Sequence, residues 1–128
     1  MVVGYAYVVG DIVHTGHLLH LRNCKQLCDK LIVGVLTDRA VMEKKPCPAL
    51  AFRDRIELVA ALRYVDAAVA QDTYSPAANV AALRPDILFE SMSHSETRYA
   101  GFEGRTLEMP YYPETSSTQI KEKIRSGQ

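Results

Sequence analysis

The 128-residue chain has no excess of charge of either sign and no long apolar run. Lysine and arginine together number 15, as do aspartate and glutamate, so the charge balance gives no general attraction to nucleic acid or to an anionic membrane. Apolar runs such as LIVGVL, residues 31–36, are far too short to span a bilayer, and the N-terminal stretch lacks the basic flank of a signal peptide. We therefore expect a cytoplasmic protein with no nucleic-acid or membrane partner.

Cysteine is also scarce. The chain has three cysteines, an odd number, so a disulfide framework is not expected. Cys24 and Cys28 are four residues apart, which predicts that both lie on one face of a helix, and Cys47 lies in a loop-like stretch. Packed thiols in a reducing compartment are the favoured interpretation, and a metal or redox site is the alternative.

The length fits one domain, and a chain of this size buries enough surface to need no stapling disulfide or metal. We find no internal repeat, low-complexity tract or linker-like stretch. Residues 1–128 are therefore expected to form a single domain, either as a small protein or as a piece of a larger one.

Short apolar runs rich in β-branched residues alternate with stretches of helical periodicity. The predicted strands are VVGYAYVV near the N-terminus, 31–36, 65–69, 86–90 and 105–109. The predicted helices are 16–30, a short turn after 37, 52–62, one from Ser75-Pro76 to just before Arg84-Pro85, a weak one at 96–103, and 116–125. This alternation predicts an α/β fold, a doubly wound Rossmann-like parallel sheet of about five strands with helices on both faces.

Ligands of such sheets bind beyond the carboxyl ends of the strands, where the strand order reverses, and the first strand normally lies beside that point. The loop after the first predicted strand is therefore the expected place for a nucleotide. That loop leads into HTGHLLH, which holds three of the four histidines of the chain.

His14 and His17 flank Gly16 where the next helix is expected to begin, so helix N–H groups and two imidazoles would form a phosphate clamp. Two histidines that only cap the helix are one alternative, and a His-x-x-His zinc site is another. Zinc is disfavoured because no nearby cysteine or carboxylate pair completes four ligands. His20, one turn further on, is expected to be an ordinary helix residue.

Other polar residues have ordinary interpretations when they are taken alone. Lys44 and Lys45 form a pair in a solvated loop, and Arg55 and Arg63 are expected to be cations on a helix surface. Three hydroxyl residues at the start of the last helix would form a simple N-cap or hold phosphate with the helix N–H groups; they are Ser116, Ser117 and Thr118.

The order of several motifs changes this interpretation. In five ordered motifs the chain resembles the small cytidylyltransferases of the HxGH nucleotidyltransferase superfamily. These motifs are GDIVHTGH before a helix, TD after the second strand, a lysine in the next loop, RYVD before the third strand and SSTQIKEKI near the end. The resemblance covers nearly the whole chain. It implies an enzyme in which a phosphate or phosphonate oxygen attacks the α-phosphorus of CTP and pyrophosphate leaves. It also implies Mg²⁺ bound with CTP, and a homodimer.

The same resemblance implies roles for individual residues. His14 and His17 would bind the triphosphate and stabilise the reacting phosphoryl group, and Asp11 would orient them or hold a cation. Lys44, with Lys45 as the neighbouring alternative, would grip phosphate on the acceptor. Arg63 would contact phosphate or hold a subunit interface with Asp66. The nucleotide-binding candidates are Val9, Gly10, Gly16, Arg63, Glu90, Ser116, Ser117 and Thr118, and no metal ligand is assigned.

Three departures from the family pattern narrow the resemblance. Val8-Val9-Gly10 replaces the usual glycine-x-phenylalanine, residues 90–96 replace an acidic segment, and PYYPET at 110–115 lacks the usual arginine. These features resemble cytidylyltransferase domains fused to phosphoenolpyruvate mutase in phosphonate pathways such as fosfomycin biosynthesis. That resemblance implies 2-hydroxyethylphosphonate as the acceptor and a mutase domain in the same polypeptide. The acceptor-binding candidates are Lys44, Ser91, Ser93, His94, Tyr111 and Tyr112.

Three alternatives remain open. Cytidylyl transfer to glycerol 3-phosphate or another phospho-alcohol is the runner-up, and adenylyl transfer is the third enzymatic hypothesis. Because the acidic segment and the arginine are missing, a catalytically silent nucleotide-binding module is the alternative from a different class.

Overall fold

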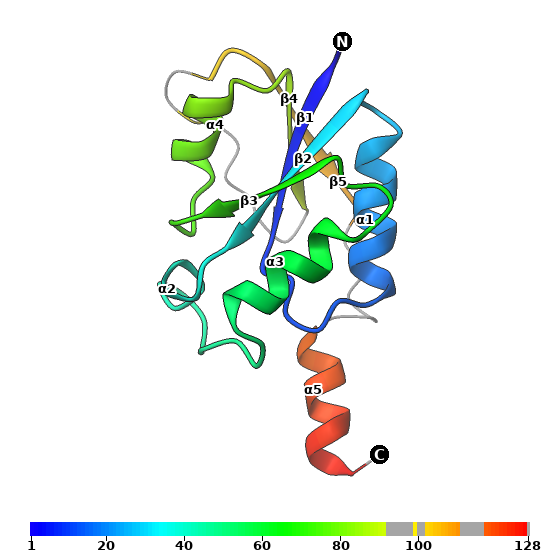
Figure 1. Ribbon diagram of the computed structural model, residues 1–128, viewed down its shortest axis with the longest axis vertical. Coiled ribbons are helices and arrows are strands. Elements are labelled where there is room, and N and C mark those ends of the chain that lie inside the picture. Colours follow the sequence, from blue (N-terminus) through cyan, green and yellow to red (C-terminus); the bar gives the residue numbers. More distant parts are fainter. Residues whose placement is uncertain (92–98, 100–101, 111–116, 128) are drawn as a thin grey trace.

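The computed structural model describes residues 1–91, 99, 102–110 and 117–127, with the backbone alone for 117–120. Within these residues, five strands form one parallel sheet in the order β3-β2-β1-β4-β5 (Figure 1). The strands are β1 (Val3–Val8), β2 (Lys30–Leu36), β3 (Ala67–Gln71), β4 (Ile87–Ser91) and β5 (Arg105–Met109). The predicted parallel sheet of five strands is confirmed.

Helices cover both faces of the sheet. The helices of the described residues are α1 (Thr15–Lys25), α2 (Asp38–Val41), α3 (Phe52–Ala60), α4 (Ala77–Leu83) and α5 (Ser117–Ser126). α1 and α3 pack on one face, where Leu21 and Val59 join Val33 of β2, whereas α4 packs on the other face, where Val80 joins Tyr5. Strands buried on both faces need apolar side chains at nearly every position, which explains the unbroken apolar run of β2. The doubly wound arrangement is therefore confirmed as well.

The strand order reverses at β1. The chain runs outward from β1 through β2 to β3, and it then returns to the other side of β1 to form β4 and β5. The carboxyl ends of β1 and β4 consequently flank the switch point at which sheets of this kind bind ligands. The segment 9–14, which contains the start of the HTGH motif, leaves β1 at this edge.

Several helix boundaries differ from the prediction, by five residues at the end of α1 and by two at the end of α3. α1 ends at Lys25 instead of continuing to residue 30, because β2 begins five residues later and the chain must first turn back. Cys28 therefore lies beyond the helix, where its thiol donates to the carbonyl oxygen of Cys24 at 3.4 Å. The prediction that both thiols share a helix face is wrong. The three cysteines are free thiols, with Cys24 buried, Cys28 half-buried and Cys47 exposed.

The start of α4 is one residue later than predicted. Pro76 occupies the N-cap position instead of the first helical position, and the Ser75 hydroxyl accepts a hydrogen bond from Ala77 N at 3.1 Å. The weak helix expected at 96–103 lies largely outside the described residues, and its described members 99, 102 and 103 are not helical.

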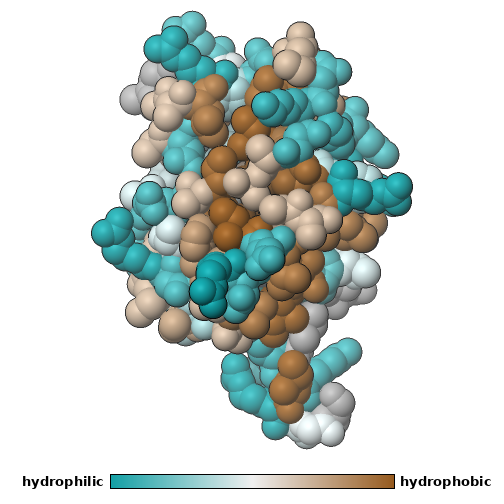
Figure 2. All heavy atoms as spheres, viewed as in Figure 1, coloured by the Kyte–Doolittle hydropathy of each residue, from teal (hydrophilic) through white to brown (hydrophobic). Residues whose placement is uncertain are grey.

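Apolar side chains gather along the middle of the face that carries α3 (Figure 2). Leu58 of α3 is 47% exposed. α5 projects away from the carboxyl edge of the sheet, below α3 in Figure 1. Over the part of the chain that the structure describes, no helix has the length and apolar character that a bilayer crossing requires.

Candidate functional site

The loop between β1 and α1 has an unusual backbone. Gly10 has φ = +73°, and a Cβ added there would lie 3.0 Å from Val59 Cγ2. Ile12 has φ = +57°, although β-branched residues strongly avoid this left-handed region. Such a conformation costs about 1–3 kcal/mol and persists only where the surroundings hold it in place. The loop is therefore fixed by its neighbours rather than by its own preference.

His14 and His17 cap α1 reciprocally. His14 is the N-cap residue, and its Nδ1 accepts a hydrogen bond from Gly16 N at 3.0 Å. His17, in the first turn, accepts from His14 N through its own Nδ1 at 3.2 Å. The two ring centroids are 4.1 Å apart, with the rings tilted by 42°. The backbone thus holds both imidazoles side by side at the start of the helix.

This arrangement also fixes the protonation state of the two rings. Burial, together with His14 and His20, lowers the pKa of His17 to about 4, and burial lowers the pKa of His14 below its ordinary value. Both imidazoles are therefore neutral at pH 7. A neutral ring whose Nδ1 accepts carries its proton on Nε2, so each ring keeps one N–H donor for a ligand. Capping and anion binding are consequently compatible roles for the same pair.

The structure differs from the predicted phosphate clamp at the backbone N–H of Gly16. The N–H of Gly16 is already taken by His14, so it is not a donor for phosphate. Gly16 is buried in the first turn, next to the two rings. A ligand at this helix start would meet the imidazole Nε2–H groups rather than this backbone N–H.

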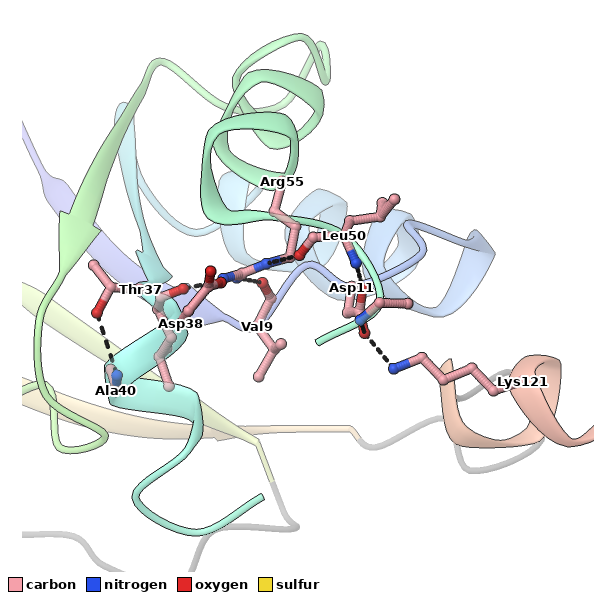
Figure 3. Close-up of polar contacts among 10 residues, drawn as sticks. Val9, Asp11, Thr37, Asp38, Ala40, Leu50, Arg55 and Lys121 are labelled. Atoms are coloured by element: carbon pink, nitrogen blue, oxygen red, sulfur yellow. Dashed lines mark hydrogen bonds and ion pairs between the residues drawn. The ribbon is translucent and has the colours of Figure 1, made fainter. Parts of the chain in front are cut away.

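Asp11 anchors the loop to two other parts of the chain (Figure 3). Its carboxylate, 3% exposed, accepts from Ala49 N and Leu50 N, both at 2.9 Å. It also forms an ion pair with Lys121 of α5. Burial raises the pKa of Asp11, but Lys121 and the two N–H groups outweigh that effect, so the pKa lies below its ordinary value. Asp11 thus holds the loop, the 49–50 segment and α5 together, and the cation that it holds is an ammonium group.

Arg55 of α3 joins three segments next to the same loop (Figure 3). Its side chain is completely buried, whereas the sequence indicated a helix-surface cation. The guanidinium donates to the carbonyl oxygens of Val9 at 2.6 Å, Leu36 at 2.7 Å and Leu50 at 3.0 Å. It also pairs with Asp38 at 2.6 Å. Arg55 therefore sets the relative positions of the carboxyl ends of β1 and β2 and of the segment before α3.

Lys44 lies in the turn after α2 and is exposed, as is Lys45. The Lys44 ammonium is 5.1 Å from the centroid of the Tyr74 ring, in the loop that follows β3. α2 starts directly after β2, so this turn belongs to the same carboxyl edge of the sheet as the histidines. The structure therefore brings Lys44 to the edge where the acceptor is expected.

Arg63 is placed elsewhere. It lies between α3 and β3, at the amino edge of the sheet, because α3 returns the chain to the start of a parallel strand. The arginine is exposed beside Tyr64, with 5.9 Å between its guanidinium carbon and the ring centroid. Asp66, its expected partner, is bound instead by Lys25 and by Leu31 N, each at 2.7 Å. The structure thus does not bring Arg63 to the histidines, and its role in phosphate binding or at a subunit interface stays a prediction.

Glu90 lies near the carboxyl end of β4, beside the switch point, and is completely buried. Its carboxylate accepts from the Tyr99 hydroxyl at 3.0 Å. Burial and the neighbouring Glu90 raise the pKa of Tyr7, which lies on the adjacent strand β1. Ser91, the last residue of β4, is half-buried. A nucleotide- or acceptor-binding role for Glu90 and Ser91 stays a prediction.

Several predicted site residues lie outside the described part of the chain. They are Ser93, His94, Tyr111, Tyr112 and Ser116. Ser117 and Thr118 belong to the first turn of α5, whose backbone alone is described there. Val9 and Gly10 lie in the loop next to Asp11, with Val9 contributing its carbonyl to Arg55.

The sequence interpretation missed Arg55 and Lys121. Lys121 follows the SSTQI stretch and reaches Asp11 across 110 residues of sequence. For the metal alternative, the described residues contain no group of three or more His, Cys, Asp or Glu side chains arranged to hold an ion. The Nε2 atom of His20 lies 3.9 Å from Cys24 Sγ, within α1.

Comparisons with known proteins agree with this fold. The family described as cytidylyltransferase-like matches residues 10–123. The FAD synthase of Methanoculleus marisnigri is 33% identical over 124 residues, covering 89% of this chain and 83% of that protein. The bifunctional protein HldE of Granulibacter bethesdensis is 33% identical over 132 residues, but this chain spans only 27% of its length. A lipopolysaccharide core biosynthesis protein from Thermoplasma volcanium has the same fold, with a TM-score of 0.81 at 24% identity, covering 88% of this chain and 98% of that one.

These relatives carry the names HldE and FAD synthase, so the narrower resemblance to phosphonate cytidylyltransferases stays a prediction. The fused mutase domain, the homodimer and the choice of CTP likewise stay predictions.

Proposed function

The chain belongs to the cytidylyltransferase-like family of nucleotidyltransferases, and from this premise we propose that it transfers CMP from CTP to the phosphonate of 2-hydroxyethylphosphonate and releases pyrophosphate. The observation that carries the transfer step is the pair of neutral, mutually capping imidazoles at the carboxyl edge of β1. The choice of base and acceptor rests on the sequence resemblance.

In the proposed reaction, a phosphonate oxygen attacks the α-phosphorus of CTP. A new P–O bond forms, the bond to the bridging oxygen breaks, and its electron pair leaves with pyrophosphate. A phosphonate is already ionised at neutral pH, so no general base is needed, and catalysis depends on positioning and on charge stabilisation. The Nε2–H groups of His14 and His17 would donate to the α-phosphoryl oxygens, whose charge distribution changes most in the transition state.

Cations reduce the repulsion between the two anionic substrates. Lys121 places an ammonium beside the HTGH loop, where it would meet the β- or γ-phosphate together with Ser116, Ser117 and Thr118. Lys44 would bind the acceptor from the α2 side, with Ser91, Ser93, His94, Tyr111 and Tyr112 as further contacts.

Mg²⁺ would enter as part of the nucleotide substrate. Asp11, the carboxylate within the loop between β1 and α1, already accepts from two N–H groups and Lys121. It is therefore a poor ligand for an additional divalent ion. The triphosphate oxygens would carry the magnesium instead.

Two proposals concern the whole protein. The chain would act as a homodimer, and a phosphoenolpyruvate mutase domain would belong to the same polypeptide. Both rest on the resemblance alone.

Adenylyl transfer is the second candidate, because a relative named FAD synthase makes a product that contains an AMP unit. A pyrophosphate-release assay that crosses CTP and ATP with 2-hydroxyethylphosphonate and glycerol 3-phosphate separates the candidates. We expect the highest kcat/KM for CTP with the phosphonate. Turnover with ATP only, or with glycerol 3-phosphate only, would replace this assignment, and no CTP-dependent turnover with the phosphonate would remove it.

Replacing Lys44 with alanine should raise the KM of the acceptor about tenfold or more, because a charge-assisted hydrogen bond to a phosphonate oxygen contributes about 1.5–3 kcal/mol. The KM of the nucleotide should change little. Steady-state kinetics with each substrate varied in turn measures both values.

Lys45→Ala is the matched control for this change, since it removes a neighbouring exposed ammonium. Its kinetic constants should stay near those of the wild type. A selective loss of nucleotide affinity in Lys44→Ala would show that Lys44 serves the other substrate.

A further inference from the structure

We propose that Tyr74 is a positioning residue for Lys44 and thereby sets the affinity of the acceptor site. This inference rests on the proposed function, because it concerns how the acceptor lysine is held. The ring of Tyr74 lies 5.1 Å below the Lys44 ammonium, within the range of a cation–π interaction. A second contact joins the same two segments, since Tyr74 N donates to the Glu43 carboxylate at 3.2 Å.

The Tyr74 ring is itself held by the fold. It packs against the small apolar cluster of Leu36, Ala40 and Val41, which joins the end of β2 to α2. α2 precedes the turn that carries Lys44. The ring therefore sits between the rigid end of the sheet and the flexible lysine side chain.

Behind Tyr74 lies a buried hydrogen-bond network that fixes its backbone. The amide nitrogen of Gln71, a residue 1% exposed, donates to Thr73 O at 3.1 Å and Tyr74 O at 3.2 Å. The Gln71 oxygen accepts from the Tyr5 hydroxyl at 2.5 Å, and that hydroxyl accepts from Asn79 at 2.9 Å. Buried networks that satisfy their members hold one geometry.

Gly34 makes room for this network. A Cβ at position 34 would lie 1.9 Å from the Tyr5 hydroxyl and 2.9 Å from Gln71 Oε1. Only glycine at the centre of β2 therefore allows the tyrosine and glutamine to meet. The network connects the centre of the sheet to the loop after β3 and, through Tyr74, to Lys44.

The benefit for binding is preorganisation. A free lysine side chain has many rotamers, and immobilising it when the acceptor binds costs about 0.5–1.5 kcal/mol. The Tyr74 ring restricts the ammonium before the acceptor arrives. Its effect should appear in the KM of the acceptor and not in kcat or in the KM of the nucleotide.

The test compares Tyr74→Leu with Tyr74→Phe. Leucine keeps an apolar side chain against α2 but removes the ring, so we expect the acceptor KM to rise about three- to tenfold. Phenylalanine keeps the ring face, so the acceptor KM of Tyr74→Phe should equal that of the wild type. Tyr64→Leu removes the ring beside Arg63 at the other edge of the sheet, and it should leave the acceptor KM unchanged.

A double-mutant cycle tests whether Tyr74 acts through Lys44. In a Lys44→Ala background, Tyr74→Leu should raise the acceptor KM no further. Equal effects of Tyr74→Leu with and without Lys44, or no effect in the wild-type background, would overturn the inference.

A readout without turnover separates this inference from the proposed function. If the wild type transfers no nucleotide to any acceptor, the proposed function fails. Proton NMR then still tests the contact, because the ring current of Tyr74 should shift the Lys44 Cε protons upfield in the wild type and in Tyr74→Phe but not in Tyr74→Leu. Identical shifts in all three proteins would refute the positioning role.

Discussion

Replacing His17 with alanine should lower the turnover number by about two to three orders of magnitude while nucleotide binding survives in part. The imidazole is neutral at pH 7, because burial and the neighbouring His14 and His20 lower its pKa to about 4. A neutral Nε2–H donor contributes little binding free energy to the ground-state triphosphate, whose charge is already solvated or bound to magnesium. The hydrogen bond becomes stronger when charge is redistributed at the α-phosphoryl group in the transition state. Loss of the imidazole therefore acts mainly on kcat.

His17→Ala also removes half of the helix cap, since His14 N loses its acceptor. Loss of a capping hydrogen bond costs about 1 kcal/mol of stability. His17→Glu separates the two effects, because a glutamate in the third position of a helix can accept from the N-cap N–H but offers no donor to phosphate. The glutamate variant should be folded and still be as slow as the alanine variant, or slower.

His20→Ala is the matched control on the same helix. His20 lies one turn beyond His17, and its ring contacts Cys24 within α1. Stopped-flow or steady-state turnover should stay within about twofold of the wild type for a residue that does not touch the reacting atoms. An unchanged turnover number in His17→Ala, or an equal loss in His20→Ala, would refute the role assigned to His17.

Much of the fold could be predicted because its signals are local. β-branched runs bounded by turns indicated the strands, and their alternation with helical stretches indicated a parallel sheet. The position of HTGH at the start of a helix beyond β1 follows from the same local pattern, and the structure places it there. The reciprocal cap of His14 and His17 also needs only residues three apart in the chain.

The residues that hold the loop could not be predicted in the same way. Asp11 binds N–H groups 38 and 39 residues away, and Lys121 lies 110 residues away. No local spacing encodes such contacts. The motif resemblance placed Asp11 beside the histidines, but it did not indicate that the loop and α5 meet on its carboxylate.

The sequence of α3 does contain a signal for the burial of Arg55. Arg55 is completely buried, whereas the apolar Leu58 of the same helix is 47% exposed. Arg55 lies three residues after Phe52 and four before Val59, so the helical spacing places it on the buried stripe. Its charge favoured a surface position, and the carbonyl groups that overcome this preference belong to the distant Val9, Leu36 and nearby Leu50.

Replacing Arg55 with leucine should lower the free energy of unfolding by about 3–5 kcal/mol. The change removes the donors of three main-chain carbonyl groups, and each carbonyl left buried without a partner costs about 1–3 kcal/mol. Leucine cannot replace these hydrogen bonds, although it fills part of the volume. Urea denaturation followed by circular dichroism measures the difference.

Two variants separate the carbonyl contacts from the ion pair and from loss of positive charge. Asp38→Asn removes the charge of a carboxylate that is 45% exposed, so it should cost about 1 kcal/mol or less. Arg53→Leu removes an exposed cation from the same helix and should change the free energy of unfolding by about 0.5 kcal/mol at most. If Arg55→Leu were no more destabilising than Arg53→Leu, the three carbonyl groups would not depend on the guanidinium. If Asp38→Asn were as destabilising as Arg55→Leu, the ion pair rather than the carbonyl contacts would hold the loop.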